Sequence, residues 1–455
     1  MSKTKRIVRG AACAAVLAVA LYGGMFARKM TTNTGVDARQ WWTIVRNPRG
    51  YFPAERDRLN VLLIGKDYNH NEKGTLYTKG ARSDTLILLS LDLAKRQVSA
   101  LSIPRDTYVE YPRGLPGRRD KINAAYAWGG EKLAVQTVGN LLGVVPDHYI
   151  ALKPDAVKSI VDQLGGVEVE AIDKMKYEDR WAGLHIDLPA GRQILNGEQA
   201  VGFTRFRKVK EVDMLPDGRM VRLRNVEHSK EEGDERRMAR QQQLLRAMLK
   251  KAKEPQMFMR ADELINHSLD AIETDLDRPQ LFALAVLFKE VKPEQMRTGT
   301  LPGSDEKRYG KWYFLPDARK KEALVAYLLK GDEAAANRLT VVEVKNGTAI
   351  RGAASQAAAV LAREGFDAKN AGNAAPPKSD ASGSGGGGEV NQTQILYGAA
   401  AVEQRARHIA ALLGGGTLTK INKEQMGQID VTVVLGRDLA PTFASPPARR
   451  EARLP

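Results

Sequence analysis

The sequence has few residues for thiol or zinc chemistry. Its 455 residues include six histidines and a single cysteine, Cys13. A single cysteine excludes an intramolecular disulfide, and so few potential ligands argue against a zinc site of ordinary spacing. No apolar region precedes Cys13, which excludes a lipoprotein. A metal ion bound by this chain therefore needs oxygen ligands.

Acidic residues are also scarce relative to basic ones. The chain has 54 Asp and Glu against 70 Lys and Arg, which gives a formal net charge of +16. Such an excess favours anionic partners, which include nucleic acid, acidic lipid headgroups and phosphorylated glycans. Charge alone does not choose among them. At 43% hydrophobic residues, the chain has enough apolar material for two or three domain cores.

A long apolar stretch near the N-terminus helps to distinguish among these anionic partners. Residues 10–28 follow a short basic tail at 1–9, and their length is close to the roughly 17 to 25 residues that span a bilayer. A cleaved signal peptide ending near Ala20 is the alternative. We favour an uncleaved transmembrane helix because the apolar run continues through Met25 and Phe26. The basic tail then stays in the cytoplasm, and the bulk of the chain lies outside the cell membrane. The basic clusters thus lie behind an export segment, which argues against nucleic acid.

Hydrophobic patterns beyond this segment predict an α/β protein. Residues 29–57 show no sustained period and suggest a juxtamembrane stalk, in which the Trp pair at 41–42 lies at the headgroups or packs on the domain. Three apolar strands are expected at 60–65, 85–91 and 98–103, and helices at 132–142, 154–164, 196–203 and 234–253. Strands that are apolar on both faces need helices on both sides of their sheet. We therefore expect a three-layer α/β/α domain with a central mixed sheet over residues 58–330.

A second, small α/β domain is predicted for residues 338–437. Strand-like and helical patterns occur twice, at 341–347 and 353–364 and again at 393–398 and 401–413, with a further strand at 431–436. This weak internal duplication surrounds a Gly-rich insert at 374–388, which suits a surface loop. Residues 438–455 are rich in Pro and Arg without apolar periodicity, and we expect a disordered tail.

Arginines occur at the edges of several segments that otherwise look like core. Arg82, Arg105 and the pair Arg205 and Arg207 border apolar stretches, and Arg237 and Arg240 lie at the start of a helix. Guanidinium groups that converge on one cavity repel one another unless a polyanion fills it. Their planar forks also match phosphate oxygens two at a time. The pattern predicts a phosphate-binding pocket, although for Arg205 and Arg207 a solvated edge is the alternative.

The helix expected from Asp234 carries the most specific pattern. Arg237, Gln241, Leu244 and Met248 follow spacings of four, three and four, so they share one face. This face is apolar toward its C-terminal end and therefore points into the core. A helix N-terminus attracts phosphate through its free N–H groups. Arg237 is thus a candidate phosphate ligand, with a structural salt bridge as the alternative.

Two aspartates are candidate metal ligands. Asp67 follows the first apolar strand and Asp84 precedes the second, so neighbouring strands place both carboxylates at one sheet edge. Paired carboxylates suit Mg²⁺, which takes one or two of them together with waters and substrate phosphates. Alternatively, each aspartate is an ordinary strand-end residue.

Seven segments in order resemble the LytR-CpsA-Psr family over about residues 59–253. They are NVLLIGKD, RSDT, SIPRDTYV, DKINAAYAWGG, GGVEVE, LNGEQAVGFTRFR and RRMARQQQ. The segment after residue 338 is similar to the accessory domain often found behind the family domain.

This resemblance implies a membrane-anchored enzyme that transfers a glycopolymer from a polyprenyl pyrophosphate carrier to peptidoglycan as a phosphodiester. It implies that Asp67 and Asp84 hold Mg²⁺, or Mn²⁺ in its place, and that the carrier's tail enters an apolar cavity. The residues implied for substrate binding or catalysis are Arg82, Asp84, Arg105, Lys121, Arg205, Arg207, Arg237, Arg240 and Gln241. A non-catalytic protein that binds polyprenyl phosphate is the alternative. Asp84 is also a candidate acceptor for the hydroxyl proton.

The chain departs from the family pattern at two places. The stretch between Asp67 and Arg82 is longer than expected, and a charged insertion at 208–232 separates Arg207 from Arg237. Both border the predicted site, and we expect them to affect acceptor recognition or to form a lid.

Overall fold

The structure, a computed structural model, consists of two compact units, one ending at Asp317 and the other beginning at Ala318. It describes residues 36–55, 57–66, 69–70, 76–77, 80–112, 118–179, 184–207, 212–214, 220–222, 228–229, 232–254, 272–374, 389–399 and 402–444. The expected transmembrane segment 10–28 and most of the Gly-rich insert lie outside these ranges. No helix within them is both long and apolar enough to cross a membrane.

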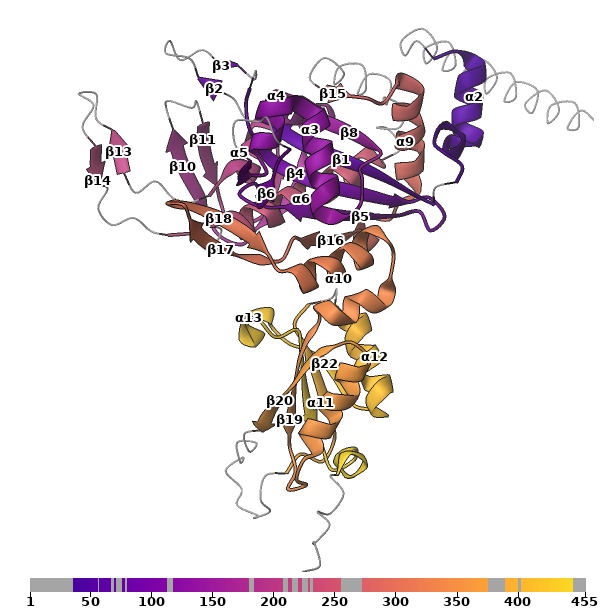
Figure 1. Cartoon of the computed structure of the whole chain (residues 1–455), viewed down its shortest axis with the longest axis vertical. Coiled ribbons are helices and arrows are strands. Elements are labelled where there is room, and N and C mark those ends of the chain that lie inside the picture. Colours follow the sequence, from indigo (N-terminus) through magenta and orange to yellow (C-terminus); the bar gives the residue numbers. More distant parts are fainter. Residues whose placement is uncertain are drawn as a thin grey trace, which may run out of the picture. The chain divides into compact units, whose positions relative to one another are not determined.

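The first unit is built around a six-stranded mixed sheet (Figure 1). Its order is β15 (Ile272–Thr274), β8 (His148–Leu152), β1 (Arg58–Lys66), β4 (Ser83–Asp92), β5 (Gln97–Ile103) and β16 (Arg297–Thr300). Strand β1 runs antiparallel to β4 and parallel to β8. The three strands predicted from apolar runs are thus β1, β4 and β5, and the mixed sheet is confirmed.

Helices cover both faces of this sheet. Leu59 and Val61 of β1 join a buried cluster with Phe282 of α9 (Arg278–Glu290). Side chains alternate along a strand, so Leu62 and Ile64, both fully buried, point to the opposite face. There, α3 (Ala124–Leu142) contacts β4 and β8, and its helical dihedrals are interrupted at Gly129 and Gly130. Two-sided burial explains why these strands are continuously apolar.

The segment expected to be an irregular stalk forms regular structure where it is described. Helix α2 (Ala38–Arg46) begins with a capping box at Asp37, and the 3-10 turn η1 (Pro48–Tyr51) follows. Val36, Ile44 and Phe52 are buried in the cluster with α9, and the ring centroid of Trp41 lies 4.7 Å from that of Phe282. The sequence did not indicate this helix because a single helix of nine residues shows too few turns for a clear period.

Three helices and two β-ribbons enclose the region beside the ends of β1 and β4. The helices are α4 (Pro154–Gln163), α5 (Gly197–Arg205) and α6 (Asp234–Ala252), and the ribbons pair β9 (Val167–Ala171) with β12 (Gly191–Leu195) and β10 (Met175–Asp179) with β11 (Leu184–Leu188). A buried cluster that includes Phe203, Phe206 and Leu244 joins α4, α5 and α6 to these ribbons. The four helices predicted in this unit are thus present.

The remaining elements of the first unit are short. They are the ribbons β2 (Asn69–His70) with β3 (Leu76–Tyr77), β6 (Tyr108–Glu110) with β7 (Arg119–Lys121), β13 (Val212–Met214) with β14 (Met220–Arg222), and β17 (Gly303–Arg308) with β18 (Lys311–Pro316), and the 3-10 turn η2 (Pro293–Gln295). Ribbons β2–β3 and β13–β14 belong to the two stretches that depart from the family pattern, most of which lie outside the described residues.

The second unit begins with α10 (Ala318–Leu329) and η3 (Glu333–Leu339), so the chain divides earlier than the expected boundary near 338. Its five strands, in the order β20, β19, β23, β21 and β22, form one sheet. The elements are β19 (Val341–Asn346), α11 (Ala353–Arg363), β20 (Asp367–Asn373), β21 (Gln394–Tyr397), α12 (Glu403–Leu413), β22 (Thr417–Lys420), α13 (Lys423–Met426), β23 (Val431–Leu435) and η5 (Ala440–Phe443). Each half is a strand, a helix and a parallel strand, which gives the duplication a structural basis.

Residues 438–444, which we expected in a disordered tail, are part of this second core. Ala440 and Phe443 are buried, and the carboxylate of Asp438 accepts hydrogen bonds from the backbone N–H and the hydroxyl of Thr393. The tail prediction was wrong here because a short 3-10 turn gives no extended apolar pattern.

Candidate functional site

A cavity of about 980 Å³ opens between the ends of β1 and β4, helices α4, α5 and α6, and the β10–β11 ribbon. Among the described residues, its lining includes charged side chains, which we call the charged part, and apolar side chains, which we call the apolar part. The charged side chains are Lys66, Asp84, Arg105, Lys153, Arg205, Arg207, Glu232, Asp234 and Arg237. The apolar side chains are Leu152, Pro154, Val157, Leu184 and Val201. The cavity therefore suits a molecule with an anionic head and an apolar tail.

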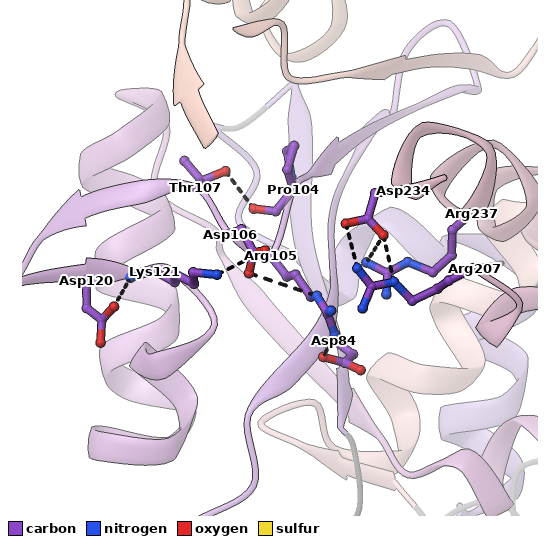
Figure 2. A network of polar contacts seen from close by, with 10 residues as sticks. All are labelled: Asp84, Pro104, Arg105, Asp106, Thr107, Asp120, Lys121, Arg207, Asp234 and Arg237. Atoms are coloured by element: carbon purple, nitrogen blue, oxygen red, sulfur yellow. Dashed lines mark hydrogen bonds and ion pairs between the residues drawn. The ribbon is translucent and has the colours of Figure 1, made fainter. Parts of the chain in front are cut away.

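Arg105 occupies the charged part just beyond the end of β5. Its Nη1 donates to Oδ1 of Asp84 at 2.7 Å, and its Nε lies 4.0 Å from Oδ1 of Asp106 (Figure 2). Burial opposes the charged form of Arg105, but Asp84 and Asp106 outweigh it and raise its pKa. The guanidinium therefore remains charged inside the cavity wall.

Asp234, the first residue of α6, holds two further arginines. Its Oδ1 and Oδ2 accept from Nε and Nη2 of Arg207 at 3.0 and 3.2 Å, and its Oδ1 lies 3.5 Å from Nη2 of Arg237 (Figure 2). Burial is the main cause that lowers the pKa of Arg237, and the charges of Arg105 and Arg207 add to it. This is the direction that like-charge repulsion among converging arginines predicts.

Two guanidinium donors in this wall have no internal acceptor. Within the described residues, the Nε atoms of Arg105 and Arg237 are buried and have no hydrogen-bond partner. Leaving a buried charged donor unsatisfied costs about 1 to 3 kcal/mol or more. Such unsatisfied groups are rare in a folded protein.

Helix α6 presents the face that its sequence predicts. Arg237 and Leu244 are buried, and Nε2 of Gln241 donates to the hydroxyl of Thr85 at 2.9 Å. Arg205 and Arg207 also line the cavity. Arg205 is the last residue of α5, because the capping box at Asn196 starts a helix that continues two residues beyond Phe203.

A second polar group lines the cavity at the end of β1. Nζ of Lys66 forms a short ion pair with Oε2 of Glu273 on β15, and the hydroxyl of Tyr126 donates to the same oxygen at 2.9 Å. The Lys66 side chain is 4% exposed, whereas that of Glu273 is 51% exposed. The hydrogen bond from Lys66 is the main cause that lowers the pKa of Glu273. This bridge ties the central strand β1 to the edge strand β15.

Three of the residues implied by the resemblance lie elsewhere. Arg82 is exposed and does not line the cavity. Lys121 contacts Asp106 at 3.1 Å, one residue away from Arg105. Arg240 is buried under α5, where its Nε donates to the carbonyl of Phe203 at 2.7 Å and its Nη2 to that of Phe206. Arg240 therefore braces the C-terminal end of α5.

The structure describes only one of the two predicted metal ligands. Asp84 lines the cavity and its side chain is 30% exposed, but Asp67 lies outside the described residues. The antiparallel register of β1 and β4 pairs Lys66 with Ser83, so the strand ends meet as expected. In the described part of the chain, no three His, Cys, Asp or Glu residues form a ligand group.

Sequence reasoning missed several residues of the site. Asp106 directly follows Arg105, and Asp234 precedes Arg237 by three residues. Acidic residues so close to a predicted arginine indicate ion pairing. In the sequence, Lys66 is a charged residue at the end of an apolar strand. Its partner Glu273 is 207 residues away, and no local pattern connects the two.

Comparisons with known proteins match both parts of the chain. The model of the LytR_cpsA_psr family matches residues 27–226 and 217–330, and that of the LytR cell envelope-related transcriptional attenuator matches 339–439. A Bacillus anthracis protein named polyisoprenyl-teichoic acid–peptidoglycan teichoic acid transferase TagU is 31% identical over 271 residues, which cover 59% of this chain and 78% of the relative.

A second relative, TagV of Bacillus subtilis, carries the same transferase name. It is 29% identical over 269 residues, covering 58% of this chain and 62% of TagV. The crystal structure of B. subtilis TagV superimposes with a TM-score of 0.48 at 26% identity, over 61% of this chain and 98% of that one.

Proposed function

Because the chain belongs to the LytR_cpsA_psr family, we propose that it is a phosphotransferase that moves a glycopolymer from a polyprenyl pyrophosphate carrier to peptidoglycan. The transferase names of its relatives support this activity. The observation that carries the proposal is that one cavity is lined both by several arginines and by apolar side chains. A polyprenyl pyrophosphate likewise combines an anionic head with an apolar tail.

The charges of the charged part are complementary to those of a diphosphate. Arg105, Arg207 and Arg237 each keep a carboxylate partner, so the fold tolerates their proximity without a ligand. The guanidinium groups of Arg105, Arg207 and Arg237 line the cavity and can give phosphate oxygens charge-assisted hydrogen bonds. The isoprenoid tail then packs against Leu152, Val157 and Val201, away from water.

The reaction needs charge neutralisation more than covalent help from the protein. A hydroxyl oxygen of the acceptor attacks the carrier-distal phosphorus, a new P–O bond forms, and the bond to the bridging oxygen breaks to release polyprenyl phosphate. The arginines stabilise negative charge on both phosphates as it shifts to the leaving group. The hydroxyl proton passes to a base at this end of the cavity, and Asp84 is the candidate for that role only in the case that it holds no metal ion.

We propose further that Asp84 and Asp67 hold Mg²⁺, or Mn²⁺ in its place. The partly exposed carboxylate of Asp84 fits a hard cation that also takes water and phosphate oxygens. When bound, such an ion polarises the phosphoryl group and neutralises charge on the leaving phosphate. Arg105 orients the Asp84 carboxylate through a 2.7 Å hydrogen bond.

Attachment to the cell membrane is also part of the proposal. The apolar stretch 10–28 with its basic flank suits a single transmembrane helix with a cytoplasmic N-terminus, and the catalytic unit then lies outside the cell. A membrane-embedded carrier and an external peptidoglycan acceptor meet on that side.

Turnover of a labelled carrier substrate tests the function. Purified protein incubated with a radiolabelled polyprenyl-pyrophosphate glycan and peptidoglycan should move the label into the acceptor and release polyprenyl phosphate. Stoichiometric binding of the carrier without any transfer would instead identify a non-catalytic lipid-phosphate protein.

A further inference from the structure

The β17–β18 hairpin ends in a turn whose sequence is unfavourable for folding. Its two central residues, Tyr309 and Gly310, have φ values of 51° and 79°, as a type I′ turn requires. Asn or Gly normally occupies the first position, and a bulky side chain with positive φ is strained. The Tyr309 side chain gains no burial in return, because the residue is 79% exposed. Strain at an exposed aromatic residue points to a role other than stability.

A second aromatic ring is exposed on the same hairpin. Trp312 is 61% exposed and lies opposite Lys307 in the strand register. Its neighbour Tyr313 points to the other face, is 4% exposed, and packs edge-on against Tyr108 with ring centroids 5.3 Å apart. One face of the hairpin is therefore fixed to the domain. Tyr309 and Trp312 are carried on a rigid two-stranded support.

The hairpin is joined to the catalytic end of the sheet. The backbone N–H of Phe314 donates to the carbonyl of Asp106 at 2.9 Å, and Phe314 also forms a β-bridge with Thr107. Asp106 directly follows Arg105, and its carboxylate contacts Lys121 at 3.1 Å. The middle of β18 is thus hydrogen-bonded to the residue next to Arg105, which we propose to bind phosphate.

Charge on the hairpin is mixed. Three basic residues, Lys307, Arg308 and Lys311, accompany two acidic ones, Asp305 and Glu306. Nη2 of Arg308 contacts Glu306 at 3.3 Å and its guanidinium lies 5.4 Å from the centre of the Tyr108 ring. An acidic membrane surface or a nucleic acid favours a strongly basic patch. Flat rings among charges of both signs instead suit a saccharide, whose C–H faces stack on aromatic rings while its hydroxyls bond to charged side chains.

We propose that Tyr309 and Trp312 form an acceptor platform that binds the glycan strand of peptidoglycan beside the transfer site. This inference rests on the proposed function, because it takes the acceptor to be a glycan. The contact between the Tyr108 and Tyr313 rings and the hydrogen bond from Phe314 to Asp106 hold the hairpin against the domain. The support of the two exposed rings is therefore fixed before a polymer binds.

The test uses full-length protein in nanodiscs, a labelled lipid-linked donor and soluble un-crosslinked peptidoglycan strands. Tyr309→Asn removes the ring while giving the turn its preferred Asn-Gly sequence, and Trp312→Thr keeps a strand-forming residue. Each variant should raise the KM for the acceptor about ten-fold, with kcat at saturating acceptor and the melting temperature little changed. Trp42→Ala, which removes an indole that is 65% exposed on α2, is the matched control and should keep the parent KM.

Binding is measured separately by sedimentation with polymer-free peptidoglycan in the absence of donor. Both hairpin variants should bind less than the parent and the Trp42→Ala control. An unchanged acceptor KM together with unchanged sedimentation overturns the platform. Fluorescence quenching by brominated phospholipids that disappears in Trp312→Phe also overturns it, since the ring then lies in the membrane. A parent protein that binds peptidoglycan through these rings but transfers no label refutes the proposed function and leaves the platform standing.

Discussion

Nη1 of Arg105 donates a 2.7 Å hydrogen bond to Oδ1 of Asp84, and this pair joins the end of β5 to the start of β4 inside the cavity. The two side chains are 18% and 30% exposed, so the pair is only partly screened by water. Asp84 thus has two proposed roles, as the ion-pair partner of Arg105 and as a ligand of the cation. Substitutions that neutralise Asp84 distinguish these two roles.

Asp84→Asn should reduce transfer steeply while leaving bound lipid phosphate unchanged or increased. The substitution removes a negative charge from an arginine-rich cavity and also removes the proposed metal ligand. EDTA should lower the activity of the parent protein to near the level of the variant, as measured by label transfer and by mass spectrometry of copurified lipid. Full parent activity in EDTA together with an inactive Asp84→Asn would reject the metal and leave Asp84 as the proton acceptor.

Arg237→Ala and Arg240→Ala should fail in different ways. Arg237 is buried beside two other arginines, so its removal should abolish transfer without lowering the melting temperature of the ligand-free protein. Arg240→Ala leaves the carbonyls of Phe203 and Phe206 without their donor, which should cost about 3 kcal/mol of stability. Calorimetry on both variants measures the two melting temperatures. A large loss of melting temperature in Arg237→Ala would show that Arg237 is mainly a structural ion-pair partner.

Filling the apolar part of the cavity should exclude the isoprenoid tail. Val201→Phe adds a ring to a wall residue, and we expect much less copurified lipid and a raised Kd for the donor. Val145→Phe makes the same change at a residue that is 66% exposed and serves as the control. Lipid extraction followed by mass spectrometry gives the comparison. Equal lipid content in the two variants would place the tail elsewhere.

Glu273→Gln should destabilise the protein in a pH-dependent way. The folded pKa of Glu273 lies below its ordinary value of 4.5, so its contribution is complete above that value and is lost as pH falls through the folded pKa. Because the side chain is half exposed, we expect about 1 kcal/mol at neutral pH. Urea unfolding at neutral and acidic pH measures the difference.

The matched control for this bridge is Glu290→Gln. Glu290 pairs with Arg96 at 2.8 Å, but Arg96 is 61% exposed whereas Lys66 is 4% exposed. The control should therefore lose less stability than Glu273→Gln at neutral pH. A difference between Glu273→Gln and the parent that is the same at neutral and strongly acidic pH would contradict the assigned ionisation.

The proposed membrane anchor predicts the behaviour of the intact chain in cells. Fractionation should recover the protein with the membrane, and N-terminal sequencing should find residues 10–28 retained. A soluble mature form that starts near Leu21 would show that the segment is a cleaved signal peptide.

The sequence by itself determined the class of the protein. Continuous apolar runs identified β1, β4 and β5, and the spacing of Arg237, Gln241 and Leu244 identified the inward face of α6. These features are local, because side-chain periodicity depends on the geometry of one element. The ordered motifs also identified the family. Short elements such as α2 and η5 escaped this reasoning because they contain too few turns to show a period.

The tertiary structure decided which charged residues act together. Arg205 and Arg237 line the cavity, whereas Arg240, only three residues along α6 from Arg237, braces the end of α5. Sequence patterns give the face of a helix but do not identify what packs against that face. The pairing of Lys66 with Glu273 likewise depends on the strand order that brings β1 and β15 to either side of β8. Such partners are set by long-range packing, because the free energy of burying a charge depends on neighbours that only the folded chain supplies.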